Sequence, residues 1–130
     1  MTCWQKRVAG LAWKIEESPR AQADLRAIFR HLYDVHRRDV GREPGMARDL
    51  AAARVQAISK GRHRIAGAPH RGTRHAIGGL DLRHVTIDRA IYWFTLHEDA
   101  QVVRIEGIFH GGQDHLGRML ARLTAEGEAG

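Results

Sequence analysis

The sequence has few cysteines and no long apolar run, and both shortages exclude whole classes of protein. Its single cysteine, Cys3, cannot form an internal disulfide and cannot by itself build a thiolate metal site. No stretch approaches the ~18 consecutive apolar residues that a membrane-spanning helix needs. The apolar stretch after Lys6 and Arg7 is interrupted by Lys14 and Glu16, so it does not form the hydrophobic region of a secretory signal. These absences predict a cytoplasmic protein with no membrane contact, no cofactor and no metal.

The length and the charge limit the remaining classes. A chain of 130 residues fits one domain, since domains of ~100–150 residues are the commonest. Hydrophobic residues make up 43% and charged residues 28%, which is ordinary for a globular fold. A formal net charge of +6 and a pI near 10.4 favour a polyanion or an acidic protein as the partner. The charge alone does not choose between nucleic acid, a ribosome and an acidic protein segment.

The N-terminal half predicts one strand followed by two helices. Residues 1–10 have no periodicity and are expected to form a loose extension, whereas residues 11–17 alternate partly between apolar and polar, as a strand does. Ser18 as N-cap and Pro19 at the first helical position then predict a helix over 19–38. A turn with Gly and Pro precedes a second predicted helix over 44–61. The apolar residues expected to be buried in this hairpin are Leu25, Ile28, Phe29, Leu32, Leu50 and Ile58.

The C-terminal half changes from a basic segment to strands. Residues 62–79 are rich in Arg, His and Gly and are expected to be irregular. Strands are predicted over 82–87, 90–97 and 101–110, an amphipathic helix over 116–123, and a flexible tail over 126–130. The prediction is a single α+β domain over 11–125 with the order β-α-α-β-β-β-α. Its helical hairpin should pack on one face of a small, mainly antiparallel sheet.

Several short motifs, in this order and spacing, resemble those of the RelE/ParE toxins over residues 12–120. The motifs are the strand Trp13–Ile15, the helix start Ser18–Leu25 (family pattern S-P-x-A-x-x-D-L), the link Gly72–Arg74 into Leu82-Arg83, and the closing run Ile108–Asp114 (family pattern I-x-H-G-x-R-D). No single one of these motifs is specific.

The resemblance implies a toxin that a cognate antitoxin holds inactive in a hetero-oligomer. The antitoxin of such pairs is usually a DNA-binding protein, ParD-like in the ParE branch, with a flexible tail that wraps the toxin. RelE-like toxins cut mRNA on the ribosome, whereas ParE-like toxins poison DNA gyrase. The resemblance itself leaves both targets open.

The residues favour the ParE-like branch. Cutting RNA through its 2′-hydroxyl needs one group that takes a proton, one that gives a proton, and cations on the phosphate. The middle strand, residues 90–96, contains no Lys or Arg, and Gly112-Gln113 stands where the family has an Arg. We therefore predict a non-catalytic gyrase inhibitor. The alternatives are an mRNA endonuclease whose site would be Arg83, His84, Arg104 and His110, and a non-toxic relative that acts as co-repressor with its antitoxin.

Two histidines and an aspartate near the C-terminus are candidate metal ligands. His110, Asp114 and His115 lie close in sequence, but Gly111-Gly112 provides no fixed spacing that would aim them at one point. We expect instead that His110 ends the last strand with a local hydrogen bond and that Asp114 caps the final helix.

Partner contacts are expected at the basic segment and at the last helix. Arg64, Arg71 and Arg74 either contact the antitoxin or target, or form a solvated connector. The basic segment lacks aromatic residues, so it offers no platform on which bases could stack. The four apolar residues of the last helix either close the core or bind a partner: Leu116, Met119, Leu120 and Leu123. A groove between the hairpin and the sheet is expected to bind an amphipathic antitoxin helix.

Overall fold

The computed structural model describes residues 13–77, 79–111 and 114–129. The extension expected at 1–10 with Cys3, the beginning of the first strand, and Gly112-Gln113 lie outside these residues. The strands are β1 (Lys14–Glu17), β2 (Thr73–Ile77), β3 (Leu80–Ile87), β4 (Ala90–His97) and β5 (Val102–His110). The helices are α2 (Pro19–Arg38), α3 (Pro44–Gly61), α4 (His63–Gly67), the 3₁₀ turn η1 (Pro69–Arg71) and α5 (His115–Ala129).

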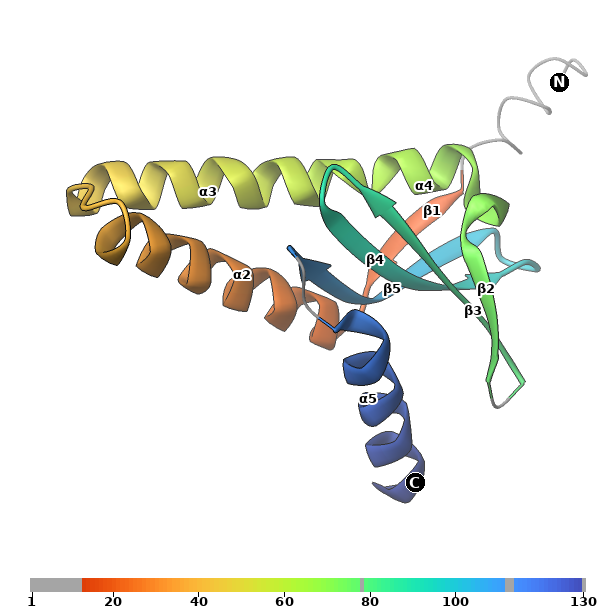
Figure 1. Ribbon diagram of the computed structural model, residues 1–130. Helices are drawn as coiled ribbons and strands as arrows, with labels where there is room; N and C mark the ends of the chain where they lie inside the picture. The colour runs from red at the N-terminus through yellow and green to blue at the C-terminus, as the bar shows by residue number, and fades with distance from the viewer. Residues whose placement is uncertain (1–12, 78, 112–113, 130) are drawn as a thin grey trace, which may run out of the picture.

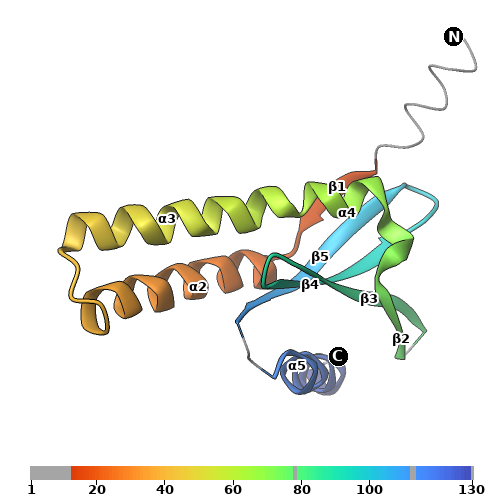
Figure 2. The same ribbon diagram turned by 45° about the horizontal axis from the view of Figure 1, so that its top comes forward.

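One five-stranded sheet forms the centre of the domain, with the order β1-β5-β4-β3-β2. β1 pairs with β5 in parallel, and the other neighbours are antiparallel. The hairpin of α2 and α3 covers one face, and α5 lies against the other (Figures 1 and 2). The predicted α+β class and the mainly antiparallel sheet are confirmed.

The hairpin helices begin where their caps predict. The Ser18 hydroxyl accepts a hydrogen bond from the Ala21 backbone N–H at 3.1 Å, and Pro19 occupies the first turn of α2. Glu43 caps α3 in the same way, because its carboxylate accepts from the Met46 N–H at 3.0 Å. Both helices have the bounds expected from the sequence, 19–38 and 44–61.

β4 is buried on both faces of the sheet. Toward the hairpin, Tyr92 and Phe94 pack in a core that includes Ile28 and Ile58. Toward α5, Trp93 packs in a second core together with the buried side chains Leu82, Ile91, Phe109 and Met119. Helices on both sides exclude charged side chains, so the absence of Lys and Arg from β4 follows from burial and carries no information about catalysis.

Five of the six apolar residues expected in the hairpin core are withdrawn from solvent, and one is not. Ile28 and Ile58 are buried, Leu25 and Leu32 pack against the same core, and Phe29 is half-buried. The prediction for Leu50 was wrong, since 37% of it is exposed. Leu50 lies in the first turns of α3, near the tip of a hairpin that projects beyond the sheet (Figure 1).

The basic segment 62–79 is not irregular, contrary to the expectation. It forms α4, η1 and the edge strand β2, which pairs with β3 from Thr73↔His84 to Ile77↔Leu80. A short polar strand has little apolar alternation, and only its cross-strand pairing with β3 defines it. The last helix is also longer than expected, because α5 continues to Ala129 and so includes residues 126–129 of the expected tail.

Candidate functional site

A straight row of side chains crosses the sheet on the face that α5 covers. Leu82 of β3 pairs with Thr95 of β4, Thr95 pairs with Arg104 of β5, and Arg104 pairs with Glu16 of β1. Directly paired residues lie on the same face of a sheet. The row therefore changes from apolar at β3 to charged at β1, and Leu82, Thr95 and Arg104 form the floor of a pocket.

A β-bulge turns a carboxylate into this floor. Phe94 pairs with Ile105 and Trp93 pairs with Gly107, which leaves Glu106 as the extra residue on β5. The Glu106 carboxylate accepts a hydrogen bond from the Thr95 hydroxyl at 3.1 Å and forms an ion pair with the Nε of Arg104 at 3.4 Å.

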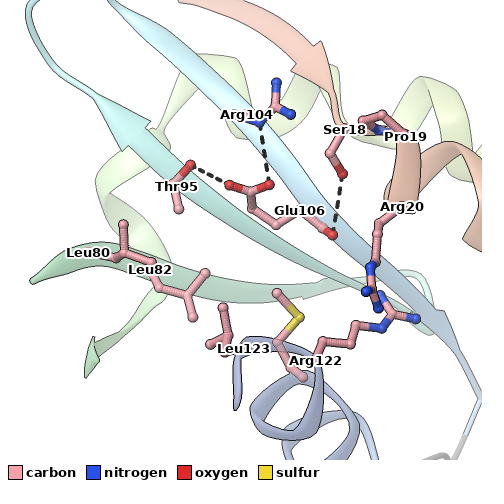
Figure 3. A pocket seen from close by; sticks show the side chains of 11 residues that line it. Ser18, Pro19, Arg20, Leu80, Leu82, Thr95, Arg104, Glu106, Arg122 and Leu123 are labelled. Atoms are coloured by element: carbon pink, nitrogen blue, oxygen red, sulfur yellow. Dashed lines mark hydrogen bonds and ion pairs between the residues drawn. The ribbon is translucent and has the colours of Figure 1, made fainter. Parts of the chain in front are cut away.

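The pocket has a volume of about 300 Å³ and two unlike halves (Figure 3). Its apolar half consists of Leu80, Leu82, Met119 and Leu123, from β3 and α5. Its polar half consists of Ser18, Pro19, Arg20, Thr95, Arg104, Glu106 and Arg122. Three arginines and one glutamate line this half, and Glu16 and Asp24 outside the lining form ion pairs with Arg104 and Arg122.

A largely buried ion pair holds α5 over the pocket. Arg122 of α5 donates from both terminal nitrogens to the carboxylate of Asp24, at 2.9 and 2.6 Å. The Ile108 backbone N–H also donates to Asp24, at 2.9 Å. Ser18 likewise reaches β5, since its hydroxyl donates to the Glu106 carbonyl at 3.4 Å. The S-P-x-A-x-x-D-L pattern therefore has a structural role: its Ser and Asp fasten α2 to β5 and α5.

Three imidazoles meet on the same face of the sheet, around Trp93. The rings of His75 and His84 stack with centroids 5.0 Å apart, and each lies 4.8 Å from the ring of Trp93. A ring nitrogen of His75 lies 2.8 Å from one of His84, so one of the two donates a hydrogen bond. The Trp93 indole N–H donates to Nδ1 of His115 at 3.1 Å, which leaves the proton of neutral His115 on Nε2. We call His75, His84 and His115 the imidazole cluster.

His84 is the central member of the imidazole cluster and is held neutral. Burial lowers the pKa of His84, and the positive charge that His115 and His75 would carry lowers that pKa further. A neutral imidazole beside a second imidazole can accept a proton at one nitrogen while its neighbour gives one.

The four residues predicted for a nuclease site do not converge. His84 and Arg104 face α5, whereas Arg83 points to the opposite face, where it donates to the His70 carbonyl at 2.9 Å and to Asp81 at 3.0 Å. His110 lies beside α3 and accepts from the Nε of Arg54 at 3.4 Å. The prediction of one site from these four was wrong, because adjacent residues of a strand point to opposite faces.

The interpretation of the C-terminal His–Asp run is partly confirmed. Asp114 caps α5, since its carboxylate accepts from the Gly117 N–H at 3.0 Å. His110 ends β5, but its partner Arg54 is distant in sequence rather than local. Burial and then the charge of Arg54 lower the pKa of His110. Within the residues that the structure describes, no group of three His, Cys, Asp or Glu side chains could hold a metal ion.

The predicted contact residues divide into exposed and buried sets. Arg64 and Arg71 border one hollow beside α4, whereas Arg74 lies on β2 with an exposed ion pair to Asp81. On α5, Met119 is 3% exposed and belongs to the core, whereas Leu116 and Leu120 are 42% and 40% exposed. Leu123 packs beside Met119. Met119 and Leu123 therefore close the core, whereas Leu116 and Leu120 remain exposed.

Sequence reasoning missed Thr95, His75 and Arg122 as parts of this face. Thr95 and His75 are revealed only by strand pairing, and Arg122 only by its contact with Asp24, 98 residues away.

In the described part of the chain, no helix is long and apolar enough to cross a membrane.

Comparisons with known proteins give the fold a name. No protein-family model matches the sequence, and no curated protein matches it. Among solved structures, the chain is similar to one from the chromosomal ParDE toxin–antitoxin system of P. aeruginosa, with a TM-score of 0.57 and 17% identity over 76% of this chain and 96% of that chain. It is also similar to a chain of the toxin–antitoxin complex RelBE2 from Mycobacterium tuberculosis, with a TM-score of 0.53 and 10% identity over 79% of this chain and 95% of that chain. The protein therefore has the RelE/ParE toxin fold that its sequence motifs predicted.

Proposed function

We propose that this protein is the toxin of a type II toxin–antitoxin pair and that it acts, like ParE, by binding DNA gyrase. The observation that supports a binding mechanism is the separation of Arg83 and His110 from His84 and Arg104 on opposite faces of the sheet. The similarity to a chain of a ParDE system supports the toxin role. A DNA-binding, ParD-like antitoxin would neutralise the toxin in a hetero-oligomer.

The surface charge supports a partner that is acidic or bound to DNA. The chain carries a formal net charge of +6, and Arg64, Arg71 and Arg74 are exposed beside α4 and on β2. Such a surface attracts acidic antitoxin segments and the DNA held by gyrase, and both attractions weaken with salt.

The test combines growth with two purified targets. Expression of the chain alone should arrest bacterial growth, and co-expression of the adjacent antitoxin gene should restore it. The purified chain should inhibit supercoiling by gyrase or stabilise cleaved DNA, and it should leave ribosome-bound mRNA intact. Harmless expression in the native host, at a level confirmed by immunoblot, would instead indicate a non-toxic co-repressor.

A second candidate function is a ribosome-dependent mRNA endonuclease, and the imidazole cluster is the observation that favours it. His84 and His75 share a hydrogen bond at 2.8 Å and provide a proton acceptor and a proton donor on one face. In this case a ribosome assay would give cuts in mRNA that disappear in His84→Ala. Cuts in mRNA that His84→Ala abolishes would indicate the endonuclease. Inhibition of gyrase without cuts in mRNA would indicate the gyrase inhibitor, so the two assays together decide between the mechanisms.

A further inference from the structure

We infer that an open hollow between the α2–α3 hairpin and the turn that joins β3 to β4 binds the terminal phosphate of a small ligand. The hollow has a volume of about 590 Å³ and lies on the hairpin side of the sheet. Free phosphate and a nucleotide both offer this chemistry. The inference goes beyond the proposed function and does not depend on it.

Four basic side chains from four parts of the chain line this hollow: His36 from α2, Arg54 from α3, Arg89 from the turn and His110 from the end of β5. Arg54 has only neutral acceptors, since its Nη2 donates to the Asp88 backbone carbonyl at 2.6 Å and its Nε to His110 at 3.4 Å. Among the residues that the structure describes, none forms a hydrogen bond or ion pair with the Arg89 guanidinium. Neither arginine is therefore neutralised by a bonded carboxylate there.

Asp88 is the one acid among the described lining residues, and its charge is directed away from the hollow. Its carboxylate is 80% exposed and forms an ion pair with Arg64 at 3.4 Å. The same charge, after burial, raises the pKa of Tyr92, which lies farther along α3 beside Ile58. Asp88 therefore acts on the neighbouring part of the hairpin.

The charges that act on His110 are positive. Burial lowers the pKa of His110, and the charges of Arg54, His31 and Arg89 lower that pKa further. These residues come from α3, α2 and the turn, so like charges approach one imidazole from three sides. A bound anion would relieve this repulsion.

A buried nitrogen in the same hollow lacks a partner. Nδ1 of His36 is buried and has no hydrogen-bond partner among the described residues. A buried polar atom left unpaired is unfavourable, because it has lost its hydrogen bonds to water. A phosphate that enters the hollow would supply the missing partner.

The backbone of the turn is strained at the residue that provides the unpaired guanidinium. Asp88 and Arg89 both have positive φ, 51° and 69°. Two-residue hairpin turns of this kind favour Asn followed by Gly, and a long side chain is rare there. Strained backbone at residues other than glycine is concentrated at functional sites, which agrees with a binding role for Arg89.

The lining suits a terminal phosphate of a small ligand better than a nucleic-acid backbone. A terminal phosphate carries nearly two negative charges at neutral pH and has three strong acceptor oxygens, which match two guanidinium groups, whereas each backbone phosphate carries one charge. No aromatic ring belongs to the described lining, so bases have no surface on which to stack. Leu32 and Leu50 provide an apolar wall for the uncharged part of a ligand.

The probe is inorganic phosphate, titrated into the purified full-length chain at constant ionic strength. The imidazole resonances of His36 and His110 should shift and saturate, and bound phosphate should raise the pKa of His110, because an anion favours the charged imidazole. Acetate under the same conditions should produce no saturating shift. Adenosine 5′-monophosphate identifies the source: tighter binding than phosphate assigns the site to a nucleotide, and weaker binding assigns it to free phosphate.

Variants of the chain place the binding in this hollow. Arg89→Glu should weaken phosphate binding by about tenfold or more, because it reverses a charge that the anion meets, whereas Arg89→Lys should retain most of the affinity. His36→Leu should weaken binding several-fold. Arg26→Glu makes the same charge change at an exposed position of α2 outside the hollow and should have little effect. Circular dichroism spectra like that of the wild type would show that each variant is folded.

Three outcomes would overturn the inference. The first is the absence of saturating shifts at His36 and His110 with phosphate, and the second is equal weakening by Arg89→Glu and Arg26→Glu. The third is an oligothymidine without terminal phosphates that binds more tightly than both phosphate and the nucleotide, which would assign the surface to nucleic acid. None of these results bears on growth arrest, so the proposed toxin function stands or fails separately.

Discussion

Asp24 connects three parts of the chain through one carboxylate. It accepts from the Ile108 backbone N–H and from two nitrogens of Arg122, and it is largely buried. Removal of a buried charged acceptor leaves its donors without partners, which is more destabilising than the loss of an exposed ion pair. This residue therefore explains why the helix-start pattern needs an Asp at that position.

Replacement of Asp24 should be costly for stability. We expect Asp24→Ala to lower the free energy of unfolding by about 2–3 kcal/mol, since Arg122 and the Ile108 N–H lose their acceptor. Asp49→Ala, at an exposed position of α3, should change it by less than about 0.5 kcal/mol. Urea denaturation measures both, and equal losses would contradict the role given to Asp24.

Tyr92 shows how a single hydroxyl links the sheet to α3. It donates to the Ile58 carbonyl at 2.6 Å, and Gly61 lies so close that a side chain there would collide with the hydroxyl. Burial, and then the negative charge of Asp88, raise the pKa of Tyr92 to about 12. The neutral phenol is thus part of the core.

This raised pKa predicts a loss of stability in alkali. The unfolded chain releases the Tyr92 proton near pH 10 and the native state only near pH 12, so stability is intact below pH 10 and declines between these values. The slope should reach about 1.4 kcal/mol per pH unit. Tyr92→Phe should remove this slope and lower stability at pH 7 by about 1 kcal/mol, whereas Tyr33→Phe should retain it. Denaturation across this range and tyrosinate absorbance test the assignment, which a persistent slope in Tyr92→Phe would refute.

At the scale of elements, α5 joins the second face of the sheet through aromatic rings. Trp93 donates to His115 at the start of α5, and the guanidinium of Arg122 lies 4.9 Å from the centre of the Phe109 ring. These contacts make the last helix part of the domain while leaving Leu116 and Leu120 exposed for a partner. The attachment of α5 therefore includes the His115 ring and the Arg122 guanidinium.

Acid should destabilise the domain. The pKa of His84 and that of His110 are both lowered, so the unfolded chain gains these protons first as pH falls below 6.5. Stability is present above that pH and declines below it. His84→Gln should reduce this loss of stability in acid, and the double variant His84→Gln/His110→Gln should reduce it further. His63→Gln, at an exposed position, should not change it. Denaturation at a series of pH values measures this, and an unchanged pH dependence in the double variant would contradict it.

At the scale of the whole molecule, positive charge is spread over α4, η1 and β2 rather than gathered in a loop. Arg64 forms an exposed ion pair with Asp88 at 3.4 Å, and Arg74 forms one with Asp81 at 3.4 Å. Exposed pairs of this kind contribute little to stability. Their arginines therefore remain available to a partner at small cost to the fold.

Charge reversal tests that surface. Arg64, Arg71 and Arg74 to Glu in one variant should weaken the antitoxin complex or target binding, and wild-type affinity should fall as salt rises. The matched control reverses Arg26, Arg30 and Arg48, which are exposed on α2 and α3, and so has the same net charge. Titration calorimetry at low and high salt compares them. If neither the variant nor salt changes the affinity, the segment is a solvated connector.

Most local elements can be predicted from short stretches of the sequence. Ser18, Pro19 and Pro44 mark helix starts that need only neighbouring backbone groups, and apolar periodicity identified α2, β4 and β5. These signals are short in range, so they can be read from adjacent residues.

Which side chains meet depends on how the strands pair. Cross-strand register placed Arg83 and His84 on opposite faces, brought His75 to His84, and made β2 an edge strand. The bulge that turns Glu106 into the pocket is likewise a property of two paired strands. A one-residue change in register exchanges the two faces of a strand, so the physical reason is that pairing, rather than residue type, decides the chemistry of this sheet.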